Sequence, residues 1–185
     1  MLLGLDVSTS ITGYTVVDDD SNIILNGAWD FRNKRKFTDI FAKAKRVNHG
    51  LDELQLSVGK QTSGHHTIDK IYIEKSLQSF RSGFSSAKTL STLSSFNGIV
   101  SWLCYEVYGI TPEYIAATSA RKKCGLKIPK GVKAKDVVIK HLVDNEPNFA
   151  IEYTRNGNPK PYCYDMADSI IVARAGLVCE QESRS

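Results

Sequence analysis

The fold is decided by residues 2–31, which read LLGLDVSTSITGYTVVDDDSNIILNGAWDF. The first apolar run, residues 2–7, is typical of a buried β-strand, and Asp6 interrupts it. A Ser-Thr-Ser turn leads to a second apolar run at residues 13–17, and an Asp- and Asn-rich turn leads to a third at residues 23–31. Because strands joined by such short connections pair antiparallel, this segment predicts a three-stranded meander.

The rest of the chain alternates helical and strand patterns. The predicted elements are, in order, a helix over residues 37–54, a strand over 71–74, a helix over 84–108, a strand over 113–117, a helix over 132–143 and a last helix from about Asp165. Residues 118–131 contain two glycines and a proline and predict a loop, and residues 180–185 predict a flexible tail. A meander followed by helix–strand units predicts one α/β domain over residues 1–185. Its five-stranded mixed sheet has three antiparallel strands, then two parallel ones, flanked by helices.

The composition indicates a globular protein. Apolar residues make up 42% of the chain and charged residues 24%, which supports a core and excludes intrinsic disorder and a coiled coil. No apolar run reaches the ~18 residues that a membrane-spanning helix needs. The N-terminal segment contains a charged residue, Asp6, within its first six positions and lacks the basic region of a signal peptide. We therefore expect a cytoplasmic protein with no membrane partner. The four cysteines lack the spacing of a zinc site, so free thiols are expected.

The basic residues gather in one segment. Eight basic residues and a single acidic one lie between Thr118 and Lys140, although the net charge of the whole chain is only +4. The remainder is therefore slightly acidic. Such a patch fits a polyanionic partner such as a nucleic acid, and on charge alone a solvated basic loop is an equal alternative.

Four acidic residues stand where exposed carboxylates are not expected. Asp6 lies inside an apolar strand, Glu74 ends another, and Asp165 and Asp168 share one face of the last helix. Each has a structural alternative: Asp165 as an N-cap, Asp168 as a first-turn acid, Asp6 in the turn that follows it and Glu74 in an ion pair with Lys75. If the first and fourth strands are neighbours, these carboxylates converge and repel one another. A divalent cation relieves that repulsion, and ligands that are all oxygen favour Mg²⁺ or Mn²⁺.

These residues resemble the RuvC family of Holliday junction resolvases, within the RNase H/retroviral-integrase superfamily. The matching motifs are GLDVSTSITGY at residues 4–14, Ile73-Glu74, and DMADS at residues 165–169, and residues 116–135 resemble the family's DNA-contacting stretch. The motifs follow the family's order over nearly the whole chain. The sequence departs from the family pattern after Asp6, where Val-Ser replaces Pro-Gly, and after Glu74, where the loop is longer and Leu77 replaces a wedging aromatic. These departures indicate a divergent branch that could be viral.

The resemblance implies an RNase H-like, Mg-dependent endodeoxyribonuclease that resolves four-way DNA junctions by paired symmetric nicks. Its catalytic residues and metal ligands would be Asp6, Glu74, Asp165 and Asp168, which hold two Mg²⁺ ions, with Mn²⁺ as a substitute. Its DNA contacts would be Phe80, Arg81, Arg121, Lys122, Lys123, Lys133 and Lys135. A homodimer suits a nearly two-fold symmetric junction, and no nucleotide cofactor is implied. The setting would be the bacterial cytosol or an infected host cell.

Three alternatives stay open on the sequence. One is another RNase H-fold nuclease, acting on RNA/DNA hybrids or other branched DNA, since it would share the acidic residues. The second is an ATP-binding domain of the actin/sugar-kinase type, which also opens with a Gly-x-Asp-x-Ser turn. This chain, however, is short for such a two-domain cleft and lacks a second Gly-rich phosphate loop. The third is a non-catalytic DNA-binding module.

Overall fold

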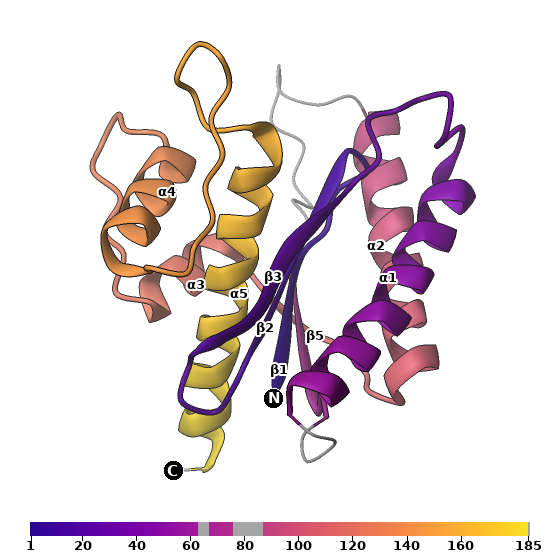
Figure 1. Cartoon of the computed structure of the whole chain (residues 1–185), viewed down its shortest axis with the longest axis horizontal. Helices are drawn as coiled ribbons and strands as arrows, with labels where there is room; N and C mark the ends of the chain where they lie inside the picture. The colour runs from indigo at the N-terminus through magenta and orange to yellow at the C-terminus, as the bar shows by residue number, and fades with distance from the viewer. Residues whose placement is uncertain (63–66, 76–86, 185) are drawn as a thin grey trace.

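The structure is a computed structural model, and it describes residues 1–62, 67–75 and 87–184. One sheet of five strands runs through the middle of the molecule in the order β3-β2-β1-β4-β5 (Figure 1). The strands are β1 (Leu2–Asp6), β2 (Ile11–Val17), β3 (Ile23–Asp30), β4 (Lys70–Glu74) and β5 (Glu113–Ile115). The first three strands pair antiparallel, and β1–β4 and β4–β5 pair parallel. The predicted α/β architecture is therefore confirmed.

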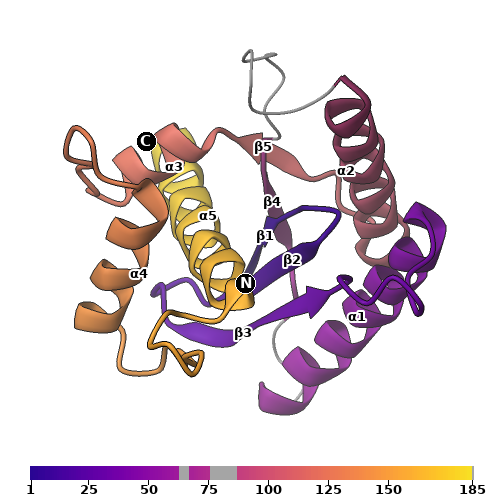
Figure 2. The same cartoon turned by 90° about the horizontal axis from the view of Figure 1, so that it is seen from above.

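Helices cover both faces of the sheet. Figure 2 shows α1 and α2 on one face and α3, α4 and α5 on the other. Their bounds are α1 (Ile40–Gln61), α2 (Ala87–Tyr108), α3 (Ala117–Lys123), α4 (Ala134–Asn145) and α5 (Pro161–Arg184). Among the described residues, no helix is both long and apolar enough to span a bilayer.

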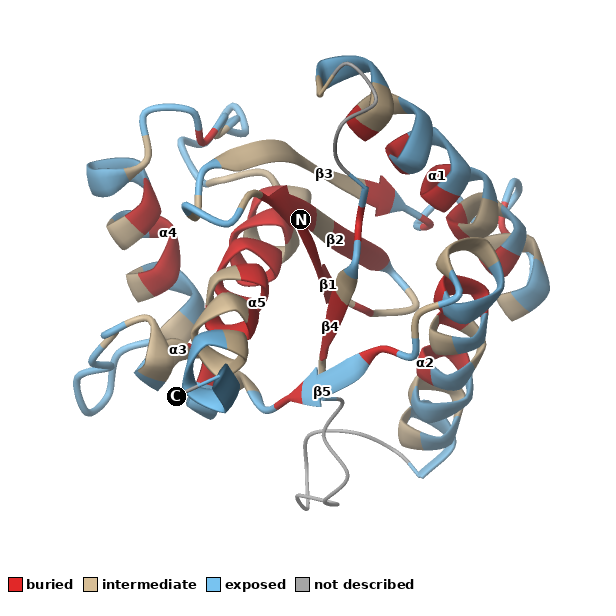
Figure 3. Ribbon diagram, turned by 90° about the horizontal axis from the view of Figure 1, so that it is seen from below, coloured by how far each residue is buried: buried red, intermediate tan, exposed pale blue. Residues whose placement is uncertain are grey.

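The sheet separates two hydrophobic cores, because successive side chains of a strand point to opposite faces. Leu3 and Leu5 of β1 pack in the core under α1 and α2, whereas Leu2 packs in the core under α5. As Figure 3 shows, the buried residues gather in the central strands, along α5 and on the sides of the other helices that face the sheet. Strand β1 is therefore covered on both faces, which explains why its sequence is a nearly continuous apolar run.

Helix α5 is buried on more than one side because it lies between the sheet and the helices α3 and α4. Small residues allow it to approach the sheet closely. A Cβ atom on Gly4 would come within 2.5–2.7 Å of the backbone and Cβ of Ala173, and a Cβ atom on Gly13 would overlap the carbonyl group of Asp165. The two strand glycines therefore set the distance between the sheet and the helix that carries Asp165 and Asp168.

Three local predictions were wrong. Residues 117–123, predicted as the end of a strand and a loop, form α3, since no helix breaker occurs before Gly125 and Ala120 is buried under the helix. Helix α5 begins at Pro161, four residues before the predicted start, because proline fits the first turn of a helix. The predicted tail from residue 180 is helical to Arg184, and Glu180 is held there by an ion pair with Lys70 (3.0 Å).

Candidate active site

Strands β1 and β4 bring Asp6 and Glu74 together. The two strands are parallel neighbours in which Leu5 pairs with Ile73, and Asp6 and Glu74 follow as the next residues of each strand. The carboxyl ends of parallel neighbours lie at the same edge of the sheet. The turn after Asp6 is held by Ser8, whose Oγ donates to the carbonyl oxygen of Ile11 (2.7 Å). Asp6 is therefore not needed to organise that turn.

Helix α5 adds two further carboxylates at this edge. Gly13, the β2 partner of Asp6, lies directly against the main chain of Asp165. Because α5 begins at Pro161, Asp165 lies in its second turn and is not an N-cap. One helical turn later, the Asp168 side chain is almost fully buried, with 4% of its surface exposed. Four acidic side chains from three distant segments thus approach one site.

Burial and neighbouring carboxylates raise the pKa values of Asp6, Glu74 and Asp165. Burial raises the pKa of Asp6 well above its ordinary value, and Glu74, Asp168 and Asp165 raise it further. Burial also raises the pKa of Glu74 to about 7, with an added contribution from Asp168 that Arg121 and Lys135 partly offset. The pKa of Asp165 is raised in the same way, by burial first and then by Asp168 against the opposing effect of Lys135. The site therefore holds more negative charge than the neighbouring cations balance.

Two residues of the basic segment enter the site. Arg121 of α3 lies 3.3 Å from Asp168, and no described residue accepts a hydrogen bond from its buried Nε. The Nζ atom of Lys135 in α4 lies 3.4 Å from Asp168 and 3.5 Å from Asp165. Although its own partial burial opposes protonation, these carboxylates together with Asp6 raise the pKa of Lys135. The two cations therefore connect the basic segment to the acidic site.

The other predicted DNA contacts lie elsewhere. Lys122 and Lys133 are exposed on α3 and at the start of α4. Lys123 forms an ion pair with Glu182 (2.6 Å), at the far end of α5 from Asp165. Phe80 and Arg81 lie outside the described residues.

Sequence reasoning missed two contributors to the site, Arg32 and Gly13. Arg32 follows β3, and its pKa is raised mainly by a hydrogen bond with Asp30, with a smaller contribution from Asp165. Because Gly13 has no Cβ atom, the main chain of Asp165 packs directly against it. Neither has a local signal, because both depend on where β2 and β3 meet α5.

The donor set suits a hard divalent cation, since four carboxylates offer only oxygen atoms and carry excess negative charge. Within residues 1–62, 67–75 and 87–184, no three acidic, His or Cys side chains already stand in a metal-binding arrangement. Two of the four carboxylates are paired with Lys135 and Arg121 instead. The residues therefore fit such a cation in chemistry and charge, and binding it would require their side chains to reorient.

Solved structures with a similar fold exist. RuvC of Thermus thermophilus in complex with a Holliday junction substrate superposes with a TM-score of 0.62, covering 98% of this chain and 94% of that chain. The chain has the RuvC fold. The sequence identity to that RuvC is 12%, so the match is one of fold.

Two further structures share the RuvC fold. A second Thermus thermophilus RuvC structure matches at a TM-score of 0.57 and 12% identity, covering 98% of this chain and 96% of that one. The yeast mitochondrial Holliday junction resolvase Ydc2 matches at 0.56 and 16% identity, covering 99% of this chain and 80% of that one. No family model and no curated protein match the sequence.

The raised pKa of Glu74 predicts that the metal-free protein loses stability as pH rises. The native state holds the Glu74 proton more tightly than the unfolded chain does, so the free energy of unfolding falls between pH 4.5 and about 7. A shift of this size corresponds to about 3 kcal/mol. Urea unfolding in EDTA should show Glu74→Gln equal to wild type at pH 4.5 and more stable at pH 8. If the difference in unfolding free energy between Glu74→Gln and wild type does not change with pH, it does not arise from the raised pKa of Glu74.

Proposed function

We propose that this protein is a metal-dependent endonuclease that resolves four-way DNA junctions by paired symmetric nicks. The observation that carries the proposal is the convergence of four mutually repelling carboxylates at one edge of a RuvC-fold sheet, next to two cations from a basic segment. One protein with this fold was solved with a Holliday junction substrate. On this proposal the protein acts in the cytoplasm of a bacterium or of an infected host cell.

The metal ligands would be Asp6, Glu74, Asp165 and Asp168, with Mg²⁺ as the metal and Mn²⁺ as a substitute. When bound, two such ions would supply an activated water and a positive charge for the leaving oxygen. Asp6 interacts electrostatically with each of the other three carboxylates, which supports its place among the proposed ligands. Lys135, which contacts Asp165 and Asp168 in the structure, would be available to a DNA phosphate once those carboxylates held a metal.

DNA would reach the site across α3 and α4. Arg121 and Lys135 lie at the carboxylates, and exposed Lys122 and Lys133 extend the positive surface away from them. Such contacts bind the phosphate backbone and give little sequence preference. Lys123 would contribute less, because it is paired with Glu182. Phe80 and Arg81, which follow Glu74 in the sequence, stay predicted contacts.

The test is incubation with Mg²⁺ and three substrates of equal length: a four-way junction, a linear duplex and an RNA/DNA hybrid. We expect paired nicks at symmetric positions in the junction and none in the duplex. Cleavage of the hybrid alone would show that the protein is instead a nuclease for RNA/DNA hybrids. Absence of cleavage of every substrate with both Mg²⁺ and Mn²⁺ would overturn the proposal.

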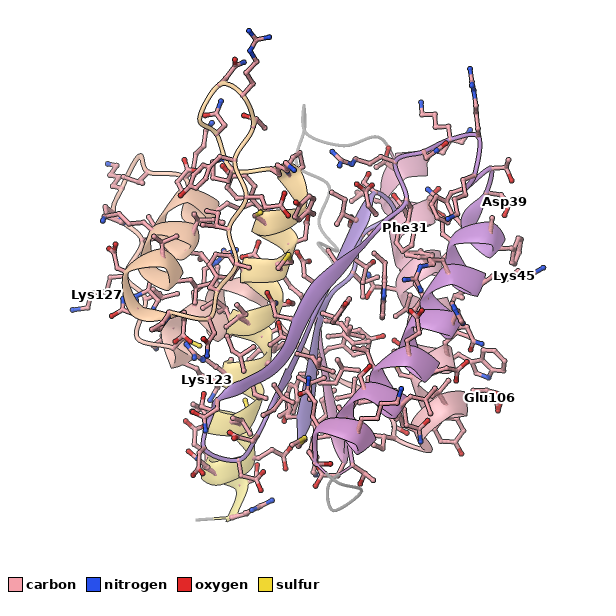
Figure 4. All side chains as sticks on the ribbon, viewed as in Figure 1. Phe31, Asp39, Lys45, Glu106, Lys123 and Lys127 are labelled. Atoms are coloured by element: carbon pink, nitrogen blue, oxygen red, sulfur yellow. The ribbon has the colours of Figure 1, made fainter. Side chains whose placement is uncertain are left out.

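Paired nicks need two active sites, and the groove between α1 and α2 offers a surface for a second copy. The groove has a volume of about 600 Å³ and a largely apolar lining. Phe41 of α1 and Trp102 of α2 are 67% and 58% exposed there, although large apolar side chains usually avoid water. Lys45 belongs to the α1 wall and Glu106 to the α2 wall, as Figure 4 shows. A two-fold axis through the groove would bring each Lys45 to the partner's Glu106.

Charge reversal tests this dimer. Lys45→Glu alone should weaken dimerisation roughly tenfold, because two acidic residues would then face each other across the two-fold axis. The double variant Lys45→Glu/Glu106→Lys should restore it. Sedimentation equilibrium measures the dimer dissociation constant. Symmetric cleavage of a junction should fall in the single variant and recover in the double variant. A protein that is monomeric at all concentrations, or a double variant without rescue, would contradict the pairing.

A further inference from the structure

The chain between α4 and α5 forms an ordered hairpin over residues 151–160. Tyr153 and Pro159 form an antiparallel bridge, and the amide of Thr154 donates to the carbonyl oxygen of Asn158 (2.7 Å). The turn at its tip closes with a bond from the amide of Gly157 to Thr154 (2.9 Å), and Gly157 adopts a φ of 75°, which suits glycine. Figure 1 shows this segment rising beyond the first turn of α5.

The base of the hairpin is fixed to the first turn of α5. The amide of Lys160 donates to the carbonyl oxygen of Glu152 (2.8 Å), and the two side chains form an ion pair (2.5 Å). The amide of Glu152 also lies 3.4 Å from the Sγ atom of buried Cys163, two residues before Asp165. The hairpin is therefore attached within one helical turn of a candidate catalytic carboxylate.

The hairpin exposes two side chains, one at the bridge and one in the turn. Tyr153 is 52% exposed, and Arg155 is exposed without an ion-pair partner among the described residues. An unpaired guanidinium binds a phosphate, and an exposed aromatic ring stacks on an unpaired base. The hairpin joins α4 to α5 and lies on the same side of the sheet as α3 and α4, the helices that carry Arg121 and Lys135 (Figure 2).

We propose that the hairpin is a DNA-binding element beside the acidic site, in which Arg155 binds a backbone phosphate and Tyr153 stacks on an unstacked base at the branch point. This inference rests on the proposed function, because it takes branched DNA as the ligand. It assigns the two side chains different roles. Arg155 recognises any DNA backbone, whereas Tyr153 recognises only a base that is freed from its stack.

Binding measurements in EDTA test the two roles without cleavage. Arg155→Ala should weaken binding to a four-way junction and to a linear duplex alike, by roughly tenfold, and should lower the salt dependence by about one unit. Tyr153→Ala should weaken junction binding by roughly tenfold and leave duplex binding within about twofold, and Tyr153→Phe should retain both. These substitutions leave the contacts of Glu152, Lys160 and Cys163 in place, so the melting temperature should not change.

Lys60→Ala is the matched control. It removes one exposed positive charge from the last turn of α1, at the opposite end of the molecule from the hairpin (Figure 1). If Arg155→Ala and Tyr153→Ala bind both DNAs as Lys60→Ala does, the hairpin is not a DNA-binding element. A wild-type protein that neither prefers nor cleaves the junction would overturn the proposed function, and the Arg155 effect on duplex binding would still test the hairpin separately.

Discussion

Asp6→Asn should abolish cleavage and leave DNA binding intact. The substitution keeps the size of the side chain but removes the charge that interacts with Glu74, Asp165 and Asp168. We expect the cleavage rate to fall by roughly a thousandfold or more, because Asp6 is a metal ligand in the proposed function. Junction affinity in EDTA should stay within about twofold of wild type, since the proposed phosphate contacts come from α3 and α4.

Although Asp6→Asn should abolish cleavage, it should raise the stability of the metal-free protein. Without metal, Asp6 is a buried carboxylate among three others, and its neutral replacement removes their repulsion. Asp6→Asn should therefore melt at a higher temperature than wild type in EDTA at pH 8, and Mg²⁺ should stabilise it less. Asp52→Asn, at an exposed position on α1, is the control. It should change neither the melting temperature in EDTA nor the stabilisation by Mg²⁺. Near-normal cleavage by Asp6→Asn would remove Asp6 from the catalytic site.

Gly13→Ala should both destabilise the protein and impair cleavage. The added Cβ atom would overlap the carbonyl group of Asp165, which belongs to the backbone and cannot rotate away. Helix α5 must then move from β2, and overpacking of this kind typically costs about 1–3 kcal/mol. The displacement also separates Asp165 from Asp6. Urea unfolding measures the first effect, and junction cleavage under conditions where the variant is fully folded measures the second.

Gly59→Ala is the matched control for Gly13→Ala. Gly59 lies within α1, where an added Cβ atom meets nothing within 4 Å, and alanine favours a helix by about 1 kcal/mol over glycine. The control should therefore be as stable as wild type or more stable, with normal cleavage. A stable and active Gly13→Ala variant would show that the close approach of β2 and α5 does not position Asp165.

The sequence by itself determined the order and type of most elements. The apolar runs in residues 2–31 predicted the meander, because alternation and turn residues act between neighbours in the chain. It also singled out Asp6 and Glu74, since a carboxylate within or at the end of an apolar strand is conspicuous without any tertiary information. The ends of α5 were less predictable, because Pro161 reads as a helix breaker and Glu180 is held by Lys70 from another strand.

Only the tertiary structure decided how the acidic residues are surrounded. The resemblance to the RuvC family implied that Arg121 and Lys135 meet DNA, and no short stretch of sequence indicated that both side chains would contact Asp168. That contact depends on α3 and α4 packing against α5. The approach of Gly13 to Asp165 likewise joins a strand to a helix at the other end of the chain. Such contacts are set by the shape and volume of side chains that meet after folding, and no short stretch of sequence encodes them.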